Sequence, residues 1–217
     1  MSLKRYIKPE IARITPEDIS NTIPLMMSGA GGDSGACANI YILFNSNSAF
    51  GQGHAAILLE KPQTGYSGSV MLFSFSPYDN ATDESPGAIA SIKNSYDSYS
   101  FSRVISACRN GGLYVSNGQY SWREGFTHFI RFNIEFSFWN RAKSRASQIA
   151  DNPPTYHLIS YNCMDFVLEI IEVASIHLKN EAGLTLVTSP PSDPNYYYLS
   201  ISKKTTGVFS FEKGSLW

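Results

Sequence analysis

The sequence predicts an α+β fold in which an antiparallel sheet packs against a helix that carries a cysteine. Two observations support this class. Three runs, at 38–44, 54–60 and 69–76, are rich in β-branched and aromatic residues, and a turn with Pro and Gly joins the last two; this pattern is typical of strands and a hairpin. A later run, from 163 to about 178, is apolar on nearly all sides, which is typical of a core helix.

Length and composition predict a single domain over residues 1–217. Of the 217 residues, 43% are hydrophobic and only 16% are charged, so the chain can bury a sizeable core. The net charge is −1 and no run of Lys or Arg forms a basic stripe. Binding to nucleic acid through neutralised phosphates is therefore not expected.

The N-terminal segment predicts a short helix after residues 15–18 and a small-residue loop at 28–36. It has basic residues, but it lacks the continuous apolar segment and the small-residue cleavage site of a signal peptide. No uninterrupted apolar stretch is long enough to cross a bilayer. We therefore expect a soluble protein with no stable membrane insertion and no export by the general secretory route.

Between 77 and 125 the sequence is polar and rich in Ser, Asn, Gly and Tyr, with weak strand signals around 99–107 and 113–120. This composition predicts an irregular insertion with short strands, a suitable place for substrate-selecting loops. Alternation predicts a strand over 126–138, and helical spacing predicts a helix over 139–151 that ends before two prolines. Further short strands are expected at 156–160, 196–202 and 207–211.

Cys163 is the favoured nucleophile. At the first turn of a buried helix, its sulfur would face unpaired backbone N–H groups and the positive end of the helix dipole, and both favour the thiolate. Asn162 is placed to cap this helix. Cys37, in a Gly-rich loop, and Cys108, before a turn, are weaker alternatives because neither begins a long apolar helix. A purely structural role for Cys163 is the other alternative.

His54 is the matching base, because it stands at the start of an apolar strand and an imidazole there can activate a nearby thiol. Counting across the hairpin puts residue 75 roughly opposite His54, so Ser74 or Ser76 would lie beside its ring. A partly exposed histidine without a catalytic role is the alternative. His128, on the strand at 126–138, is expected to be a packed or edge residue.

The cysteines and histidines predict no structural zinc and no cofactor. Three cysteines are an odd and small number for a disulfide framework, and their spacing lacks a Cys-x-x-Cys pattern. The four histidines form no pair of the His-Glu-x-x-His kind. The candidate chemistry therefore rests on the thiol and the imidazole alone.

Two segments resemble a known family. They are Gly-His-Ala-Ala-Ile-Leu-Leu at 53–59, followed by a strand that ends in Phe-Ser-Phe-Ser-Pro, and Tyr-Asn-Cys-Met-Asp-Phe-Val at 161–167. Together they look like the permuted branch of the NlpC-type papain-like cysteine hydrolases. In the unpermuted branch the Cys helix precedes the His strand, and here the order is exchanged. The resemblance covers mainly residues 38–76 and 126–178, and it implies a papain-like fold.

For catalysis, the resemblance implies that Cys163 attacks a carbonyl carbon and that His54 acts first as general base and then as general acid. A third polar residue would orient the imidazole. The family varies this residue, and the candidates in this chain are Ser74, Ser76 and the loop residues Asp79 and Asn80.

The resemblance also implies an oxyanion site. The backbone N–H of Cys163 would supply one donor to the oxyanion. Tyr161 is a candidate for the second donor, and Tyr161 and Asn162 are together the candidate substrate and oxyanion residues.

Relatives of this fold cleave peptidoglycan peptides, remove ubiquitin-like proteins, or transfer lipid acyl groups. Small bacterial domains of this kind without a signal peptide resemble antibacterial effectors of the type VI secretion system. The resemblance thus implies an amidase or endopeptidase of peptidoglycan peptides, delivered by a secretion apparatus into the target-cell periplasm and blocked by a cognate immunity protein. The alternatives are a host-directed cysteine protease or deamidase and a catalytically inactive papain-like binding domain.

Overall fold

The computed structural model describes residues 37–47, 53–61, 70–78, 84–92, 99–176, 194 and 211–216. The expected N-terminal helix, the candidate residues Asp79 and Asn80, and the strand expected at 196–202 lie outside the described residues. The elements follow in the order β1 (Cys37–Asn45), β2 (His54–Glu60), β3 (Val70–Pro77), β4 (Glu84–Ile92), α1 (Phe101–Arg109), β5 (Leu113–Ser116), β6 (Ser121–Glu124), β7 (His128–Glu135), α2 (Phe136–Asp151), β8 (Thr155–His157), α3 (Cys163–Val173) and β9 (Phe211–Ser215).

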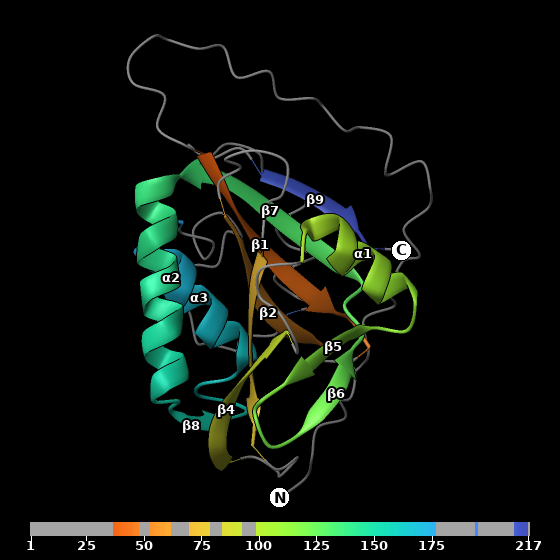
Figure 1. Cartoon of the computed structure of the whole chain (residues 1–217). Coiled ribbons are helices and arrows are strands. Elements are labelled where there is room, and N and C mark those ends of the chain that lie inside the picture. Colours follow the sequence, from red (N-terminus) through yellow and green to blue (C-terminus); the bar gives the residue numbers. More distant parts are fainter. Residues whose placement is uncertain are drawn as a thin grey trace, which may run out of the picture.

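The strands form one antiparallel sheet that curves into a half-barrel, which confirms the α+β class (Figure 1). The strand order is β6-β5-β4-β3-β2-β1-β7-β9, and β8 pairs with β4. The predicted hairpin is present, with Ile57 opposite Phe73 and Glu60 opposite Val70. β1 lies between β2 and β7, so the apolar run at 38–44 is a central strand.

One face of the sheet packs against α2 and α3, which lie together on the same side in Figure 1. Successive side chains of a strand point to opposite faces. On this face Ile40, Ile42 and Phe44 of β1 pack with Trp139 of α2 and Phe166 of α3. We call this cluster the α3-side core.

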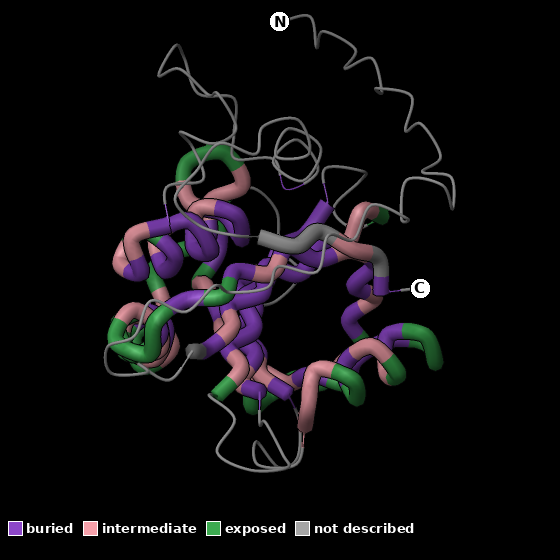
Figure 2. Tube along the Cα trace, turned by 90° about the horizontal axis from the view of Figure 1, so that it is seen from above, coloured by how far each residue is buried: buried purple, intermediate pink, exposed green. Residues whose placement is uncertain are grey.

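The opposite face packs against α1 and the β5–β6 hairpin. Here Tyr41 and Leu43 of β1 belong to the same cluster as Val104 and Cys108 of α1 and Leu113 of β5. We call this cluster the α1-side core. Figure 2 shows the buried residues running along the strands, with exposed residues on the outer turns of the helices. The sheet therefore separates two hydrophobic cores.

The expectation of an irregular insertion at 77–125 is wrong. β4 pairs with β3 from Ser74↔Ala90 to Pro77↔Gly87, so this segment extends the main sheet. The weak strand expected around 99–107 is instead a helix, α1, over Phe101–Arg109. Val104 and Cys108 lie one helical turn apart and both are buried. Burial of this helical face outweighs the weak strand propensity of the segment.

Several element boundaries also differ from expectation. The strand expected over 126–138 ends at Glu135, and α2 begins directly after it. The strand expected at 156–160 is found as β8, with shifted bounds. Of the strand expected at 207–211, only Phe211 lies among the described residues, where it begins β9. α3 ends at Val173 rather than near 178, because Ser175 has a φ of 61°, and this left-handed conformation ends a helix.

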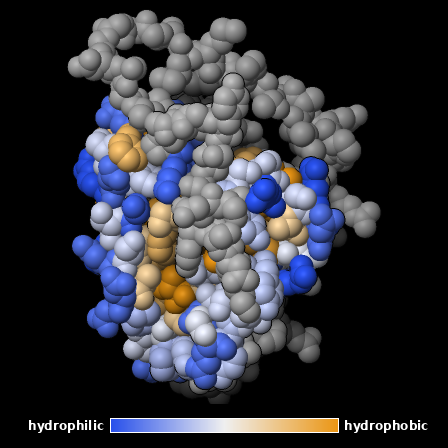
Figure 3. Space-filling view, viewed as in Figure 1, coloured by the Kyte–Doolittle hydropathy of each residue, from blue (hydrophilic) through white to orange (hydrophobic). Residues whose placement is uncertain are grey.

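In Figure 3 the surface along the outer side of α2 is polar. Hydrophobic residues are exposed next to this polar side. The polar side includes the exposed residues Arg141, Ser144 and Gln148. Among the helices that the structure describes, none combines the length and the hydropathy that a membrane span requires.

Candidate active site

His54 is the first residue of β2, and Gly53 brings the chain into the strand with a φ of 87°. This conformation is easy for glycine and strained for other residues. His54 pairs with Asn45 and is only 8% exposed. Ala56 and Leu58, which alternate with it, belong to the α1-side core. The strand alternation therefore assigns the imidazole to the α1 side of the sheet.

Cys163 is the first residue of α3 and is 4% exposed. Met164 and Phe166, which follow it, belong to the α3-side core. A thiol in the first turn lies at the positive end of the helix dipole, where a thiolate is favoured. The described residues include no hydrogen-bond acceptor for the Cys163 backbone N–H. This N–H is thus available to a developing oxyanion.

Asn162 fixes the start of α3. Its Oδ1 accepts hydrogen bonds from the N–H of Met164 at 2.8 Å and of Asp165 at 3.3 Å, and its own N–H donates to Asp165 Oδ2 at 3.0 Å. This arrangement is a capping box. The Nδ2 group donates to the carbonyl of Leu158 at 3.0 Å. Asn162 is therefore a helix cap, as predicted, and its side chain is committed to that role rather than to an oxyanion.

The structure brings His54 and Cys163 together. Burial by itself lowers the pKa of His54, but the negative charges of Cys163 and Glu124 and a hydrogen bond with the Cys163 side chain outweigh it and raise the pKa to about 9. Nε2 of His54 is engaged by Ser74 and faces Glu124. The groups around the ring therefore favour the protonated form of the imidazole.

Ser74 contacts the histidine, and Ser76 does not. Oγ of Ser74, which is fully buried, lies 2.8 Å from Nε2 of His54. Among the described residues, Ser76 has no hydrogen bond to this ring. Ser74 therefore orients the imidazole from the neighbouring strand. It is one of the two serines of this strand that the sequence analysis proposed.

Two further residues, which the sequence analysis missed, lie beside the His54 ring. Oε1 of Glu124, at the end of β6, lies 3.9 Å from Nε2 of His54. The ring of Phe126 stacks on the imidazole with centroids 6.4 Å apart. Both residues are buried. No sequence signal linked them to His54, because the contact depends on how the β5–β6 hairpin folds back over the sheet.

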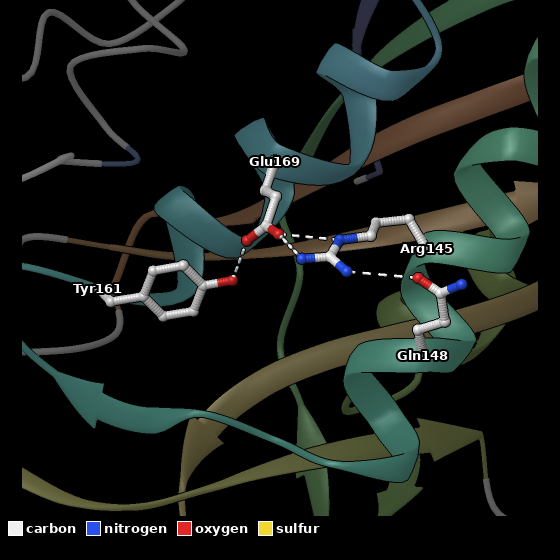
Figure 4. A network of polar contacts seen from close by, with 4 residues as sticks. All are labelled: Arg145, Gln148, Tyr161 and Glu169. Carbon is white, nitrogen blue, oxygen red and sulfur yellow. Dashed lines mark hydrogen bonds and ion pairs between the residues drawn. The ribbon is translucent and has the colours of Figure 1, made fainter.

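Tyr161 belongs to a network behind the cysteine helix (Figure 4). Its hydroxyl donates to Glu169 at 2.5 Å, and Arg145 of α2 pairs with the same carboxylate. The backbone N–H of Tyr161 donates to the carbonyl of His157 at 3.2 Å. Both of its donors are therefore used, so Tyr161 ties the segment before Cys163 to α2 and α3 and does not supply the expected second oxyanion donor.

Tyr156 is a further neighbour of the Cys163 thiol. It is 7% exposed, and its ring packs against Phe75 with centroids 5.4 Å apart. Burial raises the pKa of its hydroxyl, and the negative charges of Cys163 and Asp165 raise it further. Tyr156 is therefore a neutral neighbour of the thiol throughout the physiological range.

The other cysteines are placed differently. Cys108 is fully buried in the α1-side core. Burial raises the pKa of its thiol to about 11, although backbone hydrogen bonds from Phe126 and Leu113 act in the opposite direction. Cys37 begins β1, far along the strand from Asn45, which pairs with His54. Within the described ranges, no group of three or more His, Cys, Asp or Glu side chains is arranged to hold a metal ion.

Comparison of the chain with models of protein families, with curated proteins and with solved structures finds no match. The fold and the site thus define an α+β protein with a half-barrel sheet and a buried Cys–His pair at the start of a capped helix.

Proposed function

We propose that this chain is a cysteine hydrolase of papain-like type, with Cys163 as nucleophile and His54 as general base and acid. The observation that carries the proposal is the interaction of the Cys163 side chain with the His54 ring, which raises the pKa of the imidazole to about 9. Charge separation of this kind converts a thiol into a strong nucleophile at neutral pH. A merely structural cysteine would need no such partner.

The proposed reaction has two steps. The Cys163 thiolate attacks the carbonyl carbon of an amide, the C–N bond breaks, and the imidazolium of His54 gives its proton to the leaving nitrogen. A thioester with the acyl part of the substrate results. Water then attacks this thioester while His54 takes a proton from the water, and release of the acid restores the thiolate–imidazolium pair. The Cys163 N–H stabilises the oxyanion in both steps.

The burial of the pair constrains the substrate. Cys163 is 4% and His54 is 8% exposed, so little of either side chain is presented to a substrate. This geometry supports a slender peptide as the substrate and does not favour a broad folded protein surface. Together with the His-strand-before-Cys-helix order of the resembling hydrolases, it supports an amidase or endopeptidase of peptidoglycan peptides.

The proposal extends to the biological role. The resemblance to effectors of contractile secretion machines supports a toxin that a secretion apparatus delivers into the periplasm of a target bacterium. A protein of this kind requires a cognate immunity protein in the producing cell. Such a partner would block access to Cys163.

The test is expression in a bacterium with an added periplasmic signal. Wild type is expected to lyse the cells, whereas Cys163→Ala and His54→Ala are expected to be harmless. Cys108→Ala is the matched control, because it removes a buried thiol without touching the pair, and it should remain toxic. Purified peptidoglycan incubated with each variant, followed by mass spectrometry of released peptides, identifies the bond cleaved.

Two outcomes contradict the proposal. If all four proteins are equally toxic, the Cys163–His54 pair is not the source of toxicity. If wild type is harmless and releases no wall peptide, the wall substrate is wrong, and an inactive binding domain or a host-directed protease or deamidase takes its place.

A further inference from the structure

Glu124 is a buried carboxylate that faces the catalytic histidine. It ends β6, where it pairs with Leu113 of β5, and it is 7% exposed. Its Oε1 lies 3.9 Å from Nε2 of His54, too far for a hydrogen bond. At this distance and in this burial, the interaction between the two charges is far less screened than at the surface.

Trp122 fixes the position of this carboxylate. Its indole Nε1 donates a hydrogen bond of 2.7 Å to Oε1 of Glu124, the same oxygen that faces His54. Trp122 and Glu124 are two positions apart on a strand, so both point to the same face. The neutral indole orients the carboxylate but supplies no positive charge.

His54 supplies that charge. A buried carboxylate requires a cationic partner, because its desolvation is costly otherwise. Arg123, the neighbour of Glu124 in the chain, is exposed and directed elsewhere: its guanidinium donates to the carbonyl of Gly112 and lies over the ring of Tyr114. Among the described residues, the imidazolium of His54 is thus the cation that Glu124 faces.

The other titratable groups around the site leave this pairing intact. Cys163 of α3 faces the imidazole and adds a second negative charge. Cys108 of α1 interacts with Glu124 but stays neutral, because its pKa is raised to about 11. Tyr156 of β8 faces Cys163 and stays neutral as well. The imidazole of His54 therefore interacts with both the Cys163 side chain and the Glu124 carboxylate.

We propose that Glu124 is a positioning residue of this site, and that its carboxylate, fixed by Trp122, keeps His54 protonated so that Cys163 is a thiolate. Ser74 then sets the orientation of the imidazole ring, and Glu124 supplies the negative charge that favours its protonated form. The inference rests on the proposed function only in taking Cys163 as the nucleophile. It makes the β5–β6 hairpin a part of the active site.

Glu124→Gln tests the inference, because it keeps the size of the side chain and an oxygen for Trp122 while removing the charge. Two substrate-independent readouts are used. The first is the pH dependence of Cys163 alkylation by iodoacetamide, read by mass spectrometry of its peptide. The second is the NMR titration of the His54 ring, assigned with His54→Gln.

Loss of the charge is expected to move the His54 inflection down by at least about one pH unit, and to slow alkylation of Cys163 at pH 6.5 roughly tenfold or more. Glu60→Gln is the matched control. Glu60 is a part-buried carboxylate at the far end of β2, bonded to Asn39 and Tyr41, and its replacement should leave both readouts unchanged.

An unmoved His54 inflection in a folded Glu124→Gln protein would overturn the inference. If this variant does not fold, Trp122→Phe replaces it: the carboxylate stays but loses its anchor, and a downward shift of the inflection is again expected. An unchanged inflection in Trp122→Phe overturns the inference equally. Because neither readout needs a substrate, a shifted inflection in a protein that cleaves no wall peptide would refute the wall substrate and still support the role of Glu124.

Discussion

Ser74 reaches His54 diagonally across the hairpin. The register of β2 and β3, with Ile57 opposite Phe73, brings His54 level with Ser76 when it is continued to the strand end. The hydrogen bond of 2.8 Å nevertheless joins Nε2 of His54 to Oγ of Ser74. Diagonal neighbours on one face of an antiparallel pair lie within reach of long side chains. The imidazole thus leans along β3 toward the buried part of the sheet.

Replacing Ser74 by Ala should lower kcat/KM about tenfold or more, because a hydrogen bond to a charged group contributes roughly 1.5–3 kcal/mol. Steady-state kinetics on a peptide substrate obtained from the peptidoglycan assay measures the effect. Ser76→Ala, on the same face of the same strand, is the matched control and should retain activity. Equal losses in both variants would mean that the strand, rather than the bond to His54, is responsible.

The raised pKa of His54 predicts an alkaline limit to activity. The imidazolium is required as the acid that protonates the leaving nitrogen, and it loses its proton as the pH rises through about 9. The value of kcat/KM should therefore fall above pH 9. An ordinary histidine, with a pKa of 6.5, would place this fall in the neutral range, and a fall there would contradict the ion pair.

The same shift predicts a pH dependence of stability. Because the folded-state pKa of His54 lies above the ordinary histidine value of 6.5, its contribution to the free energy of unfolding is fully present below pH 6.5 and disappears as the pH rises through about 9. Denaturant unfolding of wild type and His54→Gln at pH 6 and pH 9.5 measures it. The difference in stability between the two proteins should shrink at the higher pH.

Asn162→Ala should destabilise the protein by about 1–2 kcal/mol, since it removes an N-cap that accepts two backbone hydrogen bonds. Chemical denaturation measures the loss. Asn152→Ala is the control, because Asn152 is an exposed residue at the end of α2; its effect should stay within about 0.5 kcal/mol. Comparable losses in both variants would argue against the capping box.

Gly87→Ala tests whether β4 belongs to the sheet. A Cβ at this position would lie 2.1 Å from the backbone oxygen of Pro154 and 2.4 Å from the ring of Phe75. Such overpacking should reduce the free energy of unfolding by about 1–3 kcal/mol. Gly125→Ala is the control, since its Cβ would meet only Asn45, at 3.8 Å. An irregular, loosely packed segment at 84–92 would tolerate both changes.

The sequence allowed the local parts of this structure to be predicted. Alternation and the polar turn identified β1, β2 and β3, and the apolar run identified the start of α3 with its cap at Asn162. The pairing of β4 with β3 and the return of β6 toward His54 were not predictable, because they join segments distant in sequence and leave no local pattern. Glu124 was missed for this reason, and α1 was missed because its helical spacing was read as a weak strand.

The two halves of the site belong to different cores. His54 stands on the strand face of the α1-side core, with Phe126 of that core stacked on its ring, whereas Cys163 begins a helix buried in the α3-side core. Each core by itself thus supplies only half of the reactive pair. The contact between Cys163 and His54 therefore requires both cores to be packed against the sheet, so the reactive pair depends on the complete fold and not on either half of it.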